Sequence, residues 1–366
     1  MVSKISTLYL RLVFILLLVV FSFHFYKSPS SKTNQAGEIN KYCLTNQFKF
    51  GNKETCYSKQ FEELATSVGP EGSFKVLDDL QKIDEDAVGC HLIAHGIGHG
   101  SFERNQSNWQ ALIQNMSPTC NYGAIHGVLE AYVDSLPNKK LSKDIIPKIC
   151  GEKPRADCNH IVGHLILVFT EGHVPRALDL CDIFTDSVQL NHCYTGVFME
   201  EETALNLVSH GYADKEWLNW PARLPELDKM CRTFGGEKLK ACWTELVHVI
   251  AVKYHNNAKE VFDYCAQAPD VEVGKSCKHH GIGIMAAGTN FDLPRIKFWC
   301  DLPQENDPNW KSDCYTQLAA STISTIPKEQ NKIKDFCQSL ESAFQSACFN
   351  QIKSYNDYTK NTFSND

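Results

Sequence analysis

The stretch Cys231–Tyr254 (CRTFGGEKLKACWTELVHVIAVKY) contains the pattern from which the fold can be predicted. Two cysteines flank a turn signal, Gly235–Gly236, and a long apolar run follows the second cysteine. Leu227 and Met230, four and one positions ahead of the first cysteine, lie on one helical face. The stretch therefore predicts a helix that ends at the first cysteine, a turn, and a second helix after the second cysteine.

The same arrangement recurs along the chain, with cysteines as its marker. The cysteines that precede the second helix of each unit follow one another at about the length of a helical-hairpin repeat, and only the interval from Cys193 to Cys242 is much longer. Seven of them have a partner one short turn earlier in the chain, and we expect each such pair to form a disulfide within its unit. The seven pairs are Cys43–Cys56, Cys150–Cys158, Cys181–Cys193, Cys231–Cys242, Cys265–Cys277, Cys300–Cys314 and Cys337–Cys348.

Two cysteines are left over. Cys90 and Cys120 occupy equivalent places in adjacent units, and both lack the earlier partner that the other units have. Three states are open for them: a disulfide with each other, two free thiols, or a bound metal.

Units of this length cannot bury their own apolar faces, so they must stack on their neighbours, as in an α-solenoid. The sequence thus predicts an all-α solenoid of about nine helical hairpins, each of about 35 residues with a disulfide inside most repeats. Each bridge would stabilise its hairpin by up to about 3 kcal/mol on the chain-entropy model.

In architecture this pattern resembles the Sel1-like and tetratricopeptide-type repeat proteins, whose hairpins have a similar length and can carry an intra-repeat disulfide. The Gly- and Asp-bearing consensus of Sel1-like repeats is absent, and the gap between paired cysteines is longer. The resemblance therefore implies a fold and no function.

The cysteines and the N-terminus both indicate export. Sixteen cysteines without a Cys-x-x-Cys motif favour an oxidising compartment. Lys4 and Arg11 precede an apolar run, Leu12–Phe23, an order that is typical of a signal peptide or a signal anchor. No good cleavage site follows, which favours an uncleaved anchor. The predicted parts are an anchor or signal peptide over residues 1–26, a polar stalk over 27–41 and the repeat domain over 42–366.

We therefore expect a protein anchored in a membrane by its N-terminal segment, with the repeat domain in a periplasm, at a cell surface or in a secretory lumen. The alternative is a secreted protein. The formal net charge of −7 and the pI near 6.1 argue against a nucleic-acid partner.

Most of the 14 histidines share one side of the predicted second helices. Numbered from the unit's cysteine, these histidines lie between about 140° and 300° around the helix, which turns by about 100° per residue. We expect them to face one common surface of the solenoid, here called the histidine face. They are His95, His99, His126, His160, His164, His248, His279 and His280. His91 lies outside this arc and is not expected to be a ligand.

Two pairs, His95/His99 and His160/His164, have the i, i+4 spacing that puts two imidazoles on one side of a helix. His126 comes from the unit between them. Neighbouring helices pack about 8 to 10 Å apart, a gap that facing histidines can close on a shared ion. These five histidines predict a divalent transition-metal site, and their chemistry suits Zn, Fe, Mn or Cu without choosing among them.

Three functions are compatible with such a site. A metal-dependent oxidoreductase or hydrolase would use the metal to activate dioxygen or water, with Glu130, one turn after His126, as the base. A non-catalytic scaffold would bind a protein or peptide along the concave face. A sequestering protein would hold a metal or a haem.

Two further patterns allow expectations that the structure can test. Several glycines, among them Gly98, Gly127, Gly163 and Gly196, lie in the predicted second helices, where glycine costs about 1 kcal/mol relative to alanine. Either the helices or a ligand must therefore approach them closely. The run Glu200–Glu202 is interpreted as a solvated face of a helix.

Overall fold

The computed structural model describes residues 35–363, with gaps at 51, 85–86, 88–89, 118, 121, 137–142, 151–155, 205–206, 209–211, 290, 303–306 and 326–329. Every regular element within these ranges is a helix, which confirms the all-α fold class. Two of these elements are short 3-10 turns, Gln106–Asn108 and Lys215–Leu218.

The helices alternate between two roles, as the cysteine pattern predicts. The first helices of the hairpins are α2 (Gln35–Phe50), α5 (Trp109–Asn115), α7 (Ile146–Ile149), α9 (Val174–Cys181), α12 (Trp220–Cys231), α14 (Ala258–Cys265), α16 (Leu293–Asp301) and α18 (Gln330–Ser339). The second helices are α3 (Lys53–Leu80), α4 (His91–Arg104), α6 (Gly123–Asp134), α8 (Ala156–Phe169), α10 (Ser187–Thr203), α13 (Gly236–Lys253), α15 (Val271–Gly288), α17 (Trp310–Thr325) and α19 (Ser342–Phe363).

Helix α3 serves two hairpins because it is kinked in the middle. Gly69 has φ 80° and ψ 174°, a backbone conformation that interrupts the helix, and Pro70 follows it. The part before the kink completes the first hairpin, and the part after it is the first helix of the second hairpin. With this division, the described helices form nine consecutive hairpins.

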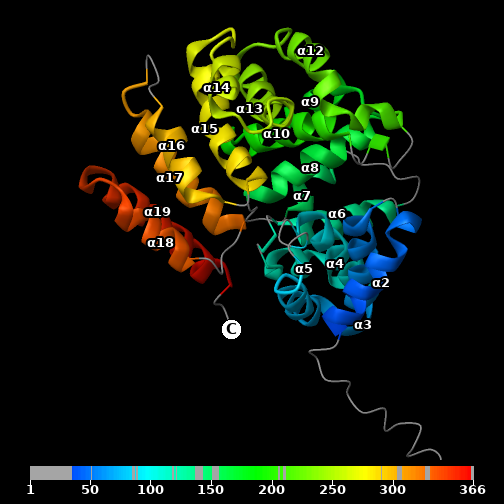
Figure 1. Cartoon of the computed structure of the whole chain (residues 1–366). Helices are drawn as coiled ribbons and strands as arrows, with labels where there is room; N and C mark the ends of the chain where they lie inside the picture. The colour runs from blue at the N-terminus through cyan, green and yellow to red at the C-terminus, as the bar shows by residue number, and fades with distance from the viewer. Residues whose placement is uncertain are drawn as a thin grey trace, which may run out of the picture.

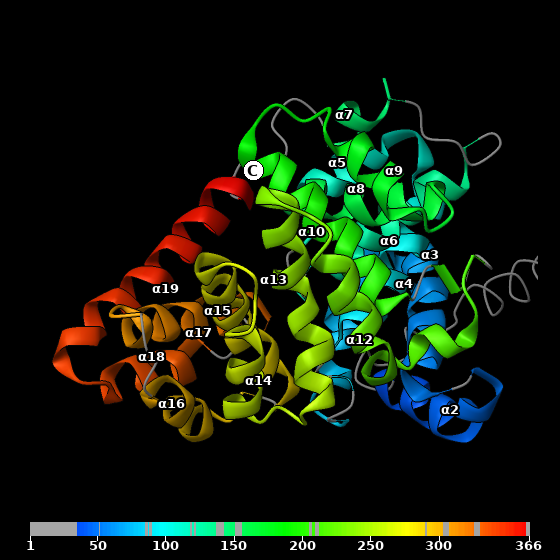
Figure 2. The ribbon, with the colours of Figure 1, turned by 90° about the horizontal axis from the view of Figure 1, so that it is seen from above.

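The second helices form a continuous inner row, in which each packs against the next along the chain. Figure 1 shows that this row rises from α3 and α4 through α10 to α13 and then descends through α15 and α17 to α19, so the array is an arch. The view from above places the first helices along the outer side of several hairpins (Figure 2). The contact between α6 and α8 is smaller than that between the other neighbouring second helices.

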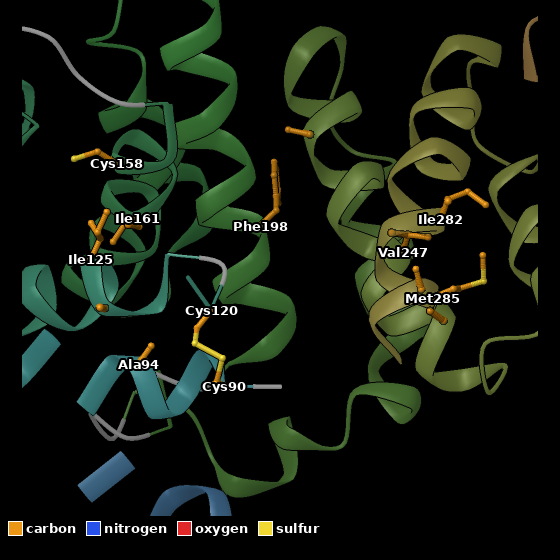
Figure 3. Packing of buried hydrophobic residues seen from close by; sticks show 14 of the residues in the cluster. Cys90, Ala94, Cys120, Ile125, Cys158, Ile161, Phe198, Val247, Ile282 and Met285 are labelled. Atoms are coloured by element: carbon orange, nitrogen blue, oxygen red, sulfur yellow. A yellow bond between two sulfur atoms is a disulfide. The ribbon is translucent and has the colours of Figure 1, made fainter. Parts of the chain in front are cut away.

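All seven predicted cysteine pairs are disulfides. Cys90 and Cys120 also form a disulfide, with a Cα–Cα distance of 5.2 Å, and no cysteine is free. This bridge joins the starts of two second helices, α4 and α6, rather than the two helices of one hairpin. Figure 3 shows it beside Ala94, within the buried apolar core.

The core runs along the interfaces between successive second helices. Val247 on α13 and Ile282 and Met285 on α15 form one such layer, and all three are fully buried (Figure 3). This packing holds the inner row in register and fixes the direction in which its polar side chains point.

The N-terminal predictions fall mainly outside the described residues. The anchor or signal peptide over 1–26 and the stalk residues 27–34 lie there. The last residues of the predicted stalk belong to α2, in which Ala36 and Ile39 are buried. Among the described residues, no helix has both the length and the apolar character required to cross a membrane.

Candidate metal centre

Four helices of the inner row cross in two pairs through glycine. A Cβ on Gly127 of α6 would lie 2.0 Å from the backbone oxygen of His95 on α4. A Cβ on Gly196 of α10 would lie 1.8 Å from the backbone oxygen of His160 on α8. Close approach of the helices therefore explains the glycines at these positions, and it brings the side chains beside each crossing within reach of one another.

The first crossing gathers three histidines. His91 and His95, one turn apart on α4, have their Nε2 atoms 3.2 Å apart. The ring of His126 on α6 lies 4.9 Å from that of His91 and 5.0 Å from that of His95, centroid to centroid. One nitrogen from each of the three residues can be chosen so that all lie within 4.8 Å of one another. This is the spacing of a group that can share one metal ion.

The other ring nitrogens of the first pair are already engaged. Nδ1 of His91 donates a hydrogen bond to the backbone oxygen of Cys120 over 3.0 Å. Nδ1 of His95 lies 3.1 Å from Oε2 of Glu130 and donates to that carboxylate. A neutral imidazole carries one N–H, so with both Nδ1 atoms donating, the 3.2 Å contact between the Nε2 atoms must be filled either by a second proton on one ring or by a cation.

Glu130 lies behind the histidines. Its Oε2 also accepts a hydrogen bond from Nε2 of His99 over 3.0 Å. Burial opposes ionisation of Glu130, but His95 and His99 outweigh it and hold the pKa of Glu130 well below its usual range. Burial likewise opposes the charged form of His99, and the hydrogen bond to Glu130 overcomes it and raises the pKa of His99. Glu130 is thus an ionised carboxylate that orients two imidazoles.

The second crossing also contains two histidines one turn apart, whose equivalents by the glycine positions are His95 and His99. His160 and His164, one turn apart on α8, have their Nε2 atoms 3.1 Å apart. Nδ1 of His164 donates to Oε2 of Glu200 over 3.1 Å. Nδ1 of His160 lies 2.9 Å from the hydroxyl oxygen of Thr195, and Nε2 of His160 lies 3.3 Å from the sulfur of Met199.

His126 connects the two groups across the narrow α6–α8 contact. Its ring centroid lies 5.3 Å from that of His164 and 6.4 Å from that of His160. Burial, followed by the nearby histidines, lowers the pKa of His126 well below its usual value. The structure therefore brings His95, His126, His160 and His164 into one row, with His99 at its edge.

His91 also lies in this row, although the helical arc placed it outside the histidine face. Positions i and i+4 differ by only about 40° around a helix, so His91 lies beside His95 although the predicted arc stopped short of it. Burial and the nearby His95 lower the pKa of His91 to about 4, which keeps this ring neutral. The i, i+4 spacing of His91 and His95 was the signal in the sequence.

The predicted histidines farther along the chain form two separate clusters. Glu245, His248 and His280 have candidate ligand atoms within 4.8 Å of one another, and so do His279, Asp307 and Asp313. In the first of these clusters, burial raises the pKa of Glu245 to about 8 and lowers that of His280 to about 3.

The run Glu200–Glu202 is buried, so its interpretation as a solvated face was wrong. The exposed fractions of the three residues are 1%, 5% and 0%. Glu201 forms an ion pair with Arg223 over 2.8 Å. Burial raises the pKa of Glu202 well above its usual value, and neither carboxylate oxygen of Glu202 has a hydrogen-bond partner among the described residues. Helix α10 lies between α8 and α13 in the inner row, and these neighbours shield the three glutamates from solvent.

Comparisons with protein-family models, with curated proteins and with solved structures found no match to this chain. The eight disulfides indicate an oxidising, extracytoplasmic environment. A function must therefore be inferred from the chemistry of the row of histidines on the inner helices.

Proposed function

We propose that this is an extracytoplasmic helical-repeat protein that binds a divalent transition metal on its histidine face, through His91, His95 and His126. Membrane anchoring by residues 1–26 is part of the proposal and rests on the sequence alone. The observation that carries the metal site is the contact between Nε2 of His91 and Nε2 of His95, 3.2 Å apart with both Nδ1 atoms engaged.

Two facing lone pairs repel unless something positive lies between them. A metal ion removes the repulsion, because ligand nitrogens at about 2.0 to 2.1 Å from a tetrahedral zinc are themselves about 3.3 Å apart. Without an ion, one ring must carry a second proton. Burial and His95 keep the pKa of His91 at about 4, so His91 does not supply that proton at neutral pH, and the metal-free alternative places it on His95, beside Glu130.

The surroundings of the pair match those of metal-binding histidines in general. Such histidines usually donate their second ring N–H to a carboxylate or a backbone oxygen, which fixes the ring and makes the ligand nitrogen more basic. His95 donates to Glu130, and His91 donates to the oxygen of Cys120. This role for Glu130 replaces that of a general base.

Three histidine ligands leave a fourth position for water, which is the usual arrangement of catalytic rather than structural zinc sites. The site therefore favours activation of a bound water, as in a hydrolase, or of dioxygen with a redox-active metal. Haem fits less well, because a porphyrin plane has no room between nitrogens 3.2 Å apart. A protein or peptide partner on the concave face stays a prediction from the sequence.

Elemental analysis tests the proposal. The exported protein is purified without chelators or metal-affinity resin, and the metal content of the wild type is compared with that of His91→Asn and His95→Asn. His255→Asn is the matched control, because His255 is exposed, lies outside the histidine face and has φ 51°, which asparagine tolerates.

We expect each of the two ligand variants to lose about one equivalent of metal relative to the wild type, and the control to lose none. Circular dichroism verifies that the helices are intact in each variant. Wild-type protein without stoichiometric metal, or folded ligand variants that keep the full metal content, would refute the proposal.

A further inference from the structure

The two glycine crossings are equivalent, residue by residue. The pairs compared are His95/His99 and His160/His164. In both, a glycine three residues after the first histidine packs against the partner helix: Gly98 follows His95, and Gly163 follows His160. In both, the glycine of the partner helix, Gly127 or Gly196, contacts the backbone oxygen of that first histidine.

This equivalence aligns Glu130 with Met199. Each lies three residues after the partner helix's glycine, but Glu130 contacts Nδ1 of His95, whereas Met199 contacts Nε2 of His160. The first crossing therefore presents a hard, anionic carboxylate at this position, whereas the second presents a soft, neutral thioether.

The donor atoms of the second crossing converge. The Nε2 atoms of His160 and His164 are 3.1 Å apart, and the sulfur of Met199 lies 3.3 Å from the first of them. Met199 and His160 are partly buried, and His164 is buried, so bulk water has little access to these atoms.

The remaining ring nitrogens are held by partners that leave Nε2 free to bind. His164 donates its Nδ1–H to Glu200. The Thr195 hydroxyl donates to the backbone oxygen of His192 over 2.9 Å, so its oxygen is available to accept from Nδ1 of His160. With this hydroxyl orientation, Nε2 of His160 and Nε2 of His164 both keep a lone pair, and Nε2 of His160 lies within 3.3 Å of both other donor atoms.

We propose that His160, His164 and Met199 form a second metal site, distinct from that of His91, His95 and His126, and that it is selective for copper(I). Thioether sulfur is a ligand of soft ions and contributes little to binding zinc, while imidazole suits both metals. Two imidazoles and one thioether give copper(I) three neutral donors, and the carboxylate of Glu200 compensates the positive charge through His164.

Met199→Leu tests this inference, because leucine has nearly the same volume as methionine but no donor atom. Copper(I) affinity is measured anaerobically by competition with bicinchoninate, and zinc(II) affinity is measured separately. Met230→Leu on α12 is the matched control, since Met230 is also partly buried and is remote in sequence from the site.

We expect Met199→Leu to weaken copper(I) binding at least about tenfold. Loss of a residue that only supports a metal ligand already costs about 10- to 100-fold in metal affinity. Zinc(II) affinity and the copper(I) affinity of Met230→Leu should stay at the wild-type level. X-ray absorption of the copper(I)-loaded wild type should show a sulfur neighbour that is absent in Met199→Leu. Unchanged copper(I) affinity, equal losses for both metals, or no sulfur neighbour in the wild type would overturn the inference.

The same titrations in His95→Asn separate the two proposals. This variant removes a ligand of the first site only, so copper(I) binding that depends on Met199 should persist in it. If it persists while the wild type holds no metal at His91 and His95, only the proposed function fails.

Discussion

Replacing Gly196 by alanine should separate α8 from α10. The added Cβ would lie 1.8 Å from the backbone oxygen of His160 and 3.1 Å from Cα of Gly163, whereas ordinary contact begins at 3.4 Å. The two helices must therefore move apart at this point until the backbone oxygen reaches ordinary contact distance. Neither obstacle is a flexible side chain, so no rotamer change can relieve the overlap.

The expected cost follows from two opposing effects. Overpacking a tight interface costs about 1 to 3 kcal/mol, and sometimes more, and backbone on both sides places this case at the upper end. Alanine regains about 1 kcal/mol of helix propensity relative to glycine. We therefore expect Gly196→Ala to lower the free energy of unfolding by about 2 kcal/mol or more.

Urea unfolding of the fully oxidised protein measures this difference. Gly37→Ala in α2 is the control, because a Cβ there meets nothing within 4 Å and the substitution should stabilise the protein by up to about 1 kcal/mol. Equal slopes of the unfolding curves allow the midpoints to be compared directly. If Gly196→Ala proved as stable as the wild type or more stable, the reasoning from close helix approach would be refuted.

Two further predictions concern stability. Replacing Cys90 and Cys120 together by serine should cost about 3.6 kcal/mol on the chain-entropy model, because this bridge closes a loop of 30 residues. Urea unfolding measures the loss, and an unchanged midpoint would show that the bridge does not constrain the unfolded chain. Arg223→Met should cost about 3 to 5 kcal/mol, because it leaves the carboxylate of Glu201 buried and unpaired. Adding Glu201→Gln should restore part of that loss, and no restoration would contradict the assignment.

The disulfide framework was predictable because most of it is local. Cysteines that lie close together in the chain, with a turn between two amphipathic segments, allow few alternative pairings. The pairing of Cys90 with Cys120 could not be predicted in this way, since the two residues belong to different hairpins. Their bridge depends on how closely α4 approaches α6, and that distance is set by Gly98 and Gly127.

The histidine face was predictable because side-chain direction on a helix follows from residue number. His95, His126, His160 and His164 come together for that reason. The partners of the ring nitrogens were not predictable. Glu130 was placed on the correct face, but its contact with two imidazoles depends on the crossing of α4 and α6.

Met199 and Glu200 show what the sequence could not supply. Met199 has no charge or pattern that marks it as a ligand, and only the contact of α8 with α10 brings its sulfur to His160. A run of three glutamates ordinarily predicts solvent exposure. Glu200 is nevertheless buried, because its two oxygens accept hydrogen bonds from His164 and from the backbone nitrogen of Leu207.

The disulfides and the glycine crossings act together on the same atoms. Cys90–Cys120 fixes the start of α4 against the start of α6, and the oxygen of Cys120 itself accepts the hydrogen bond from His91. The ring of His91, a proposed ligand, is therefore oriented by backbone and by a covalent bond, which cost little to hold in place. A site whose geometry is fixed in advance selects metals by geometry and donor type, since its donors cannot rearrange to suit the more strongly binding ion. The two proposed sites, one with a thioether donor and one without, would then hold two different metals in one row of imidazoles.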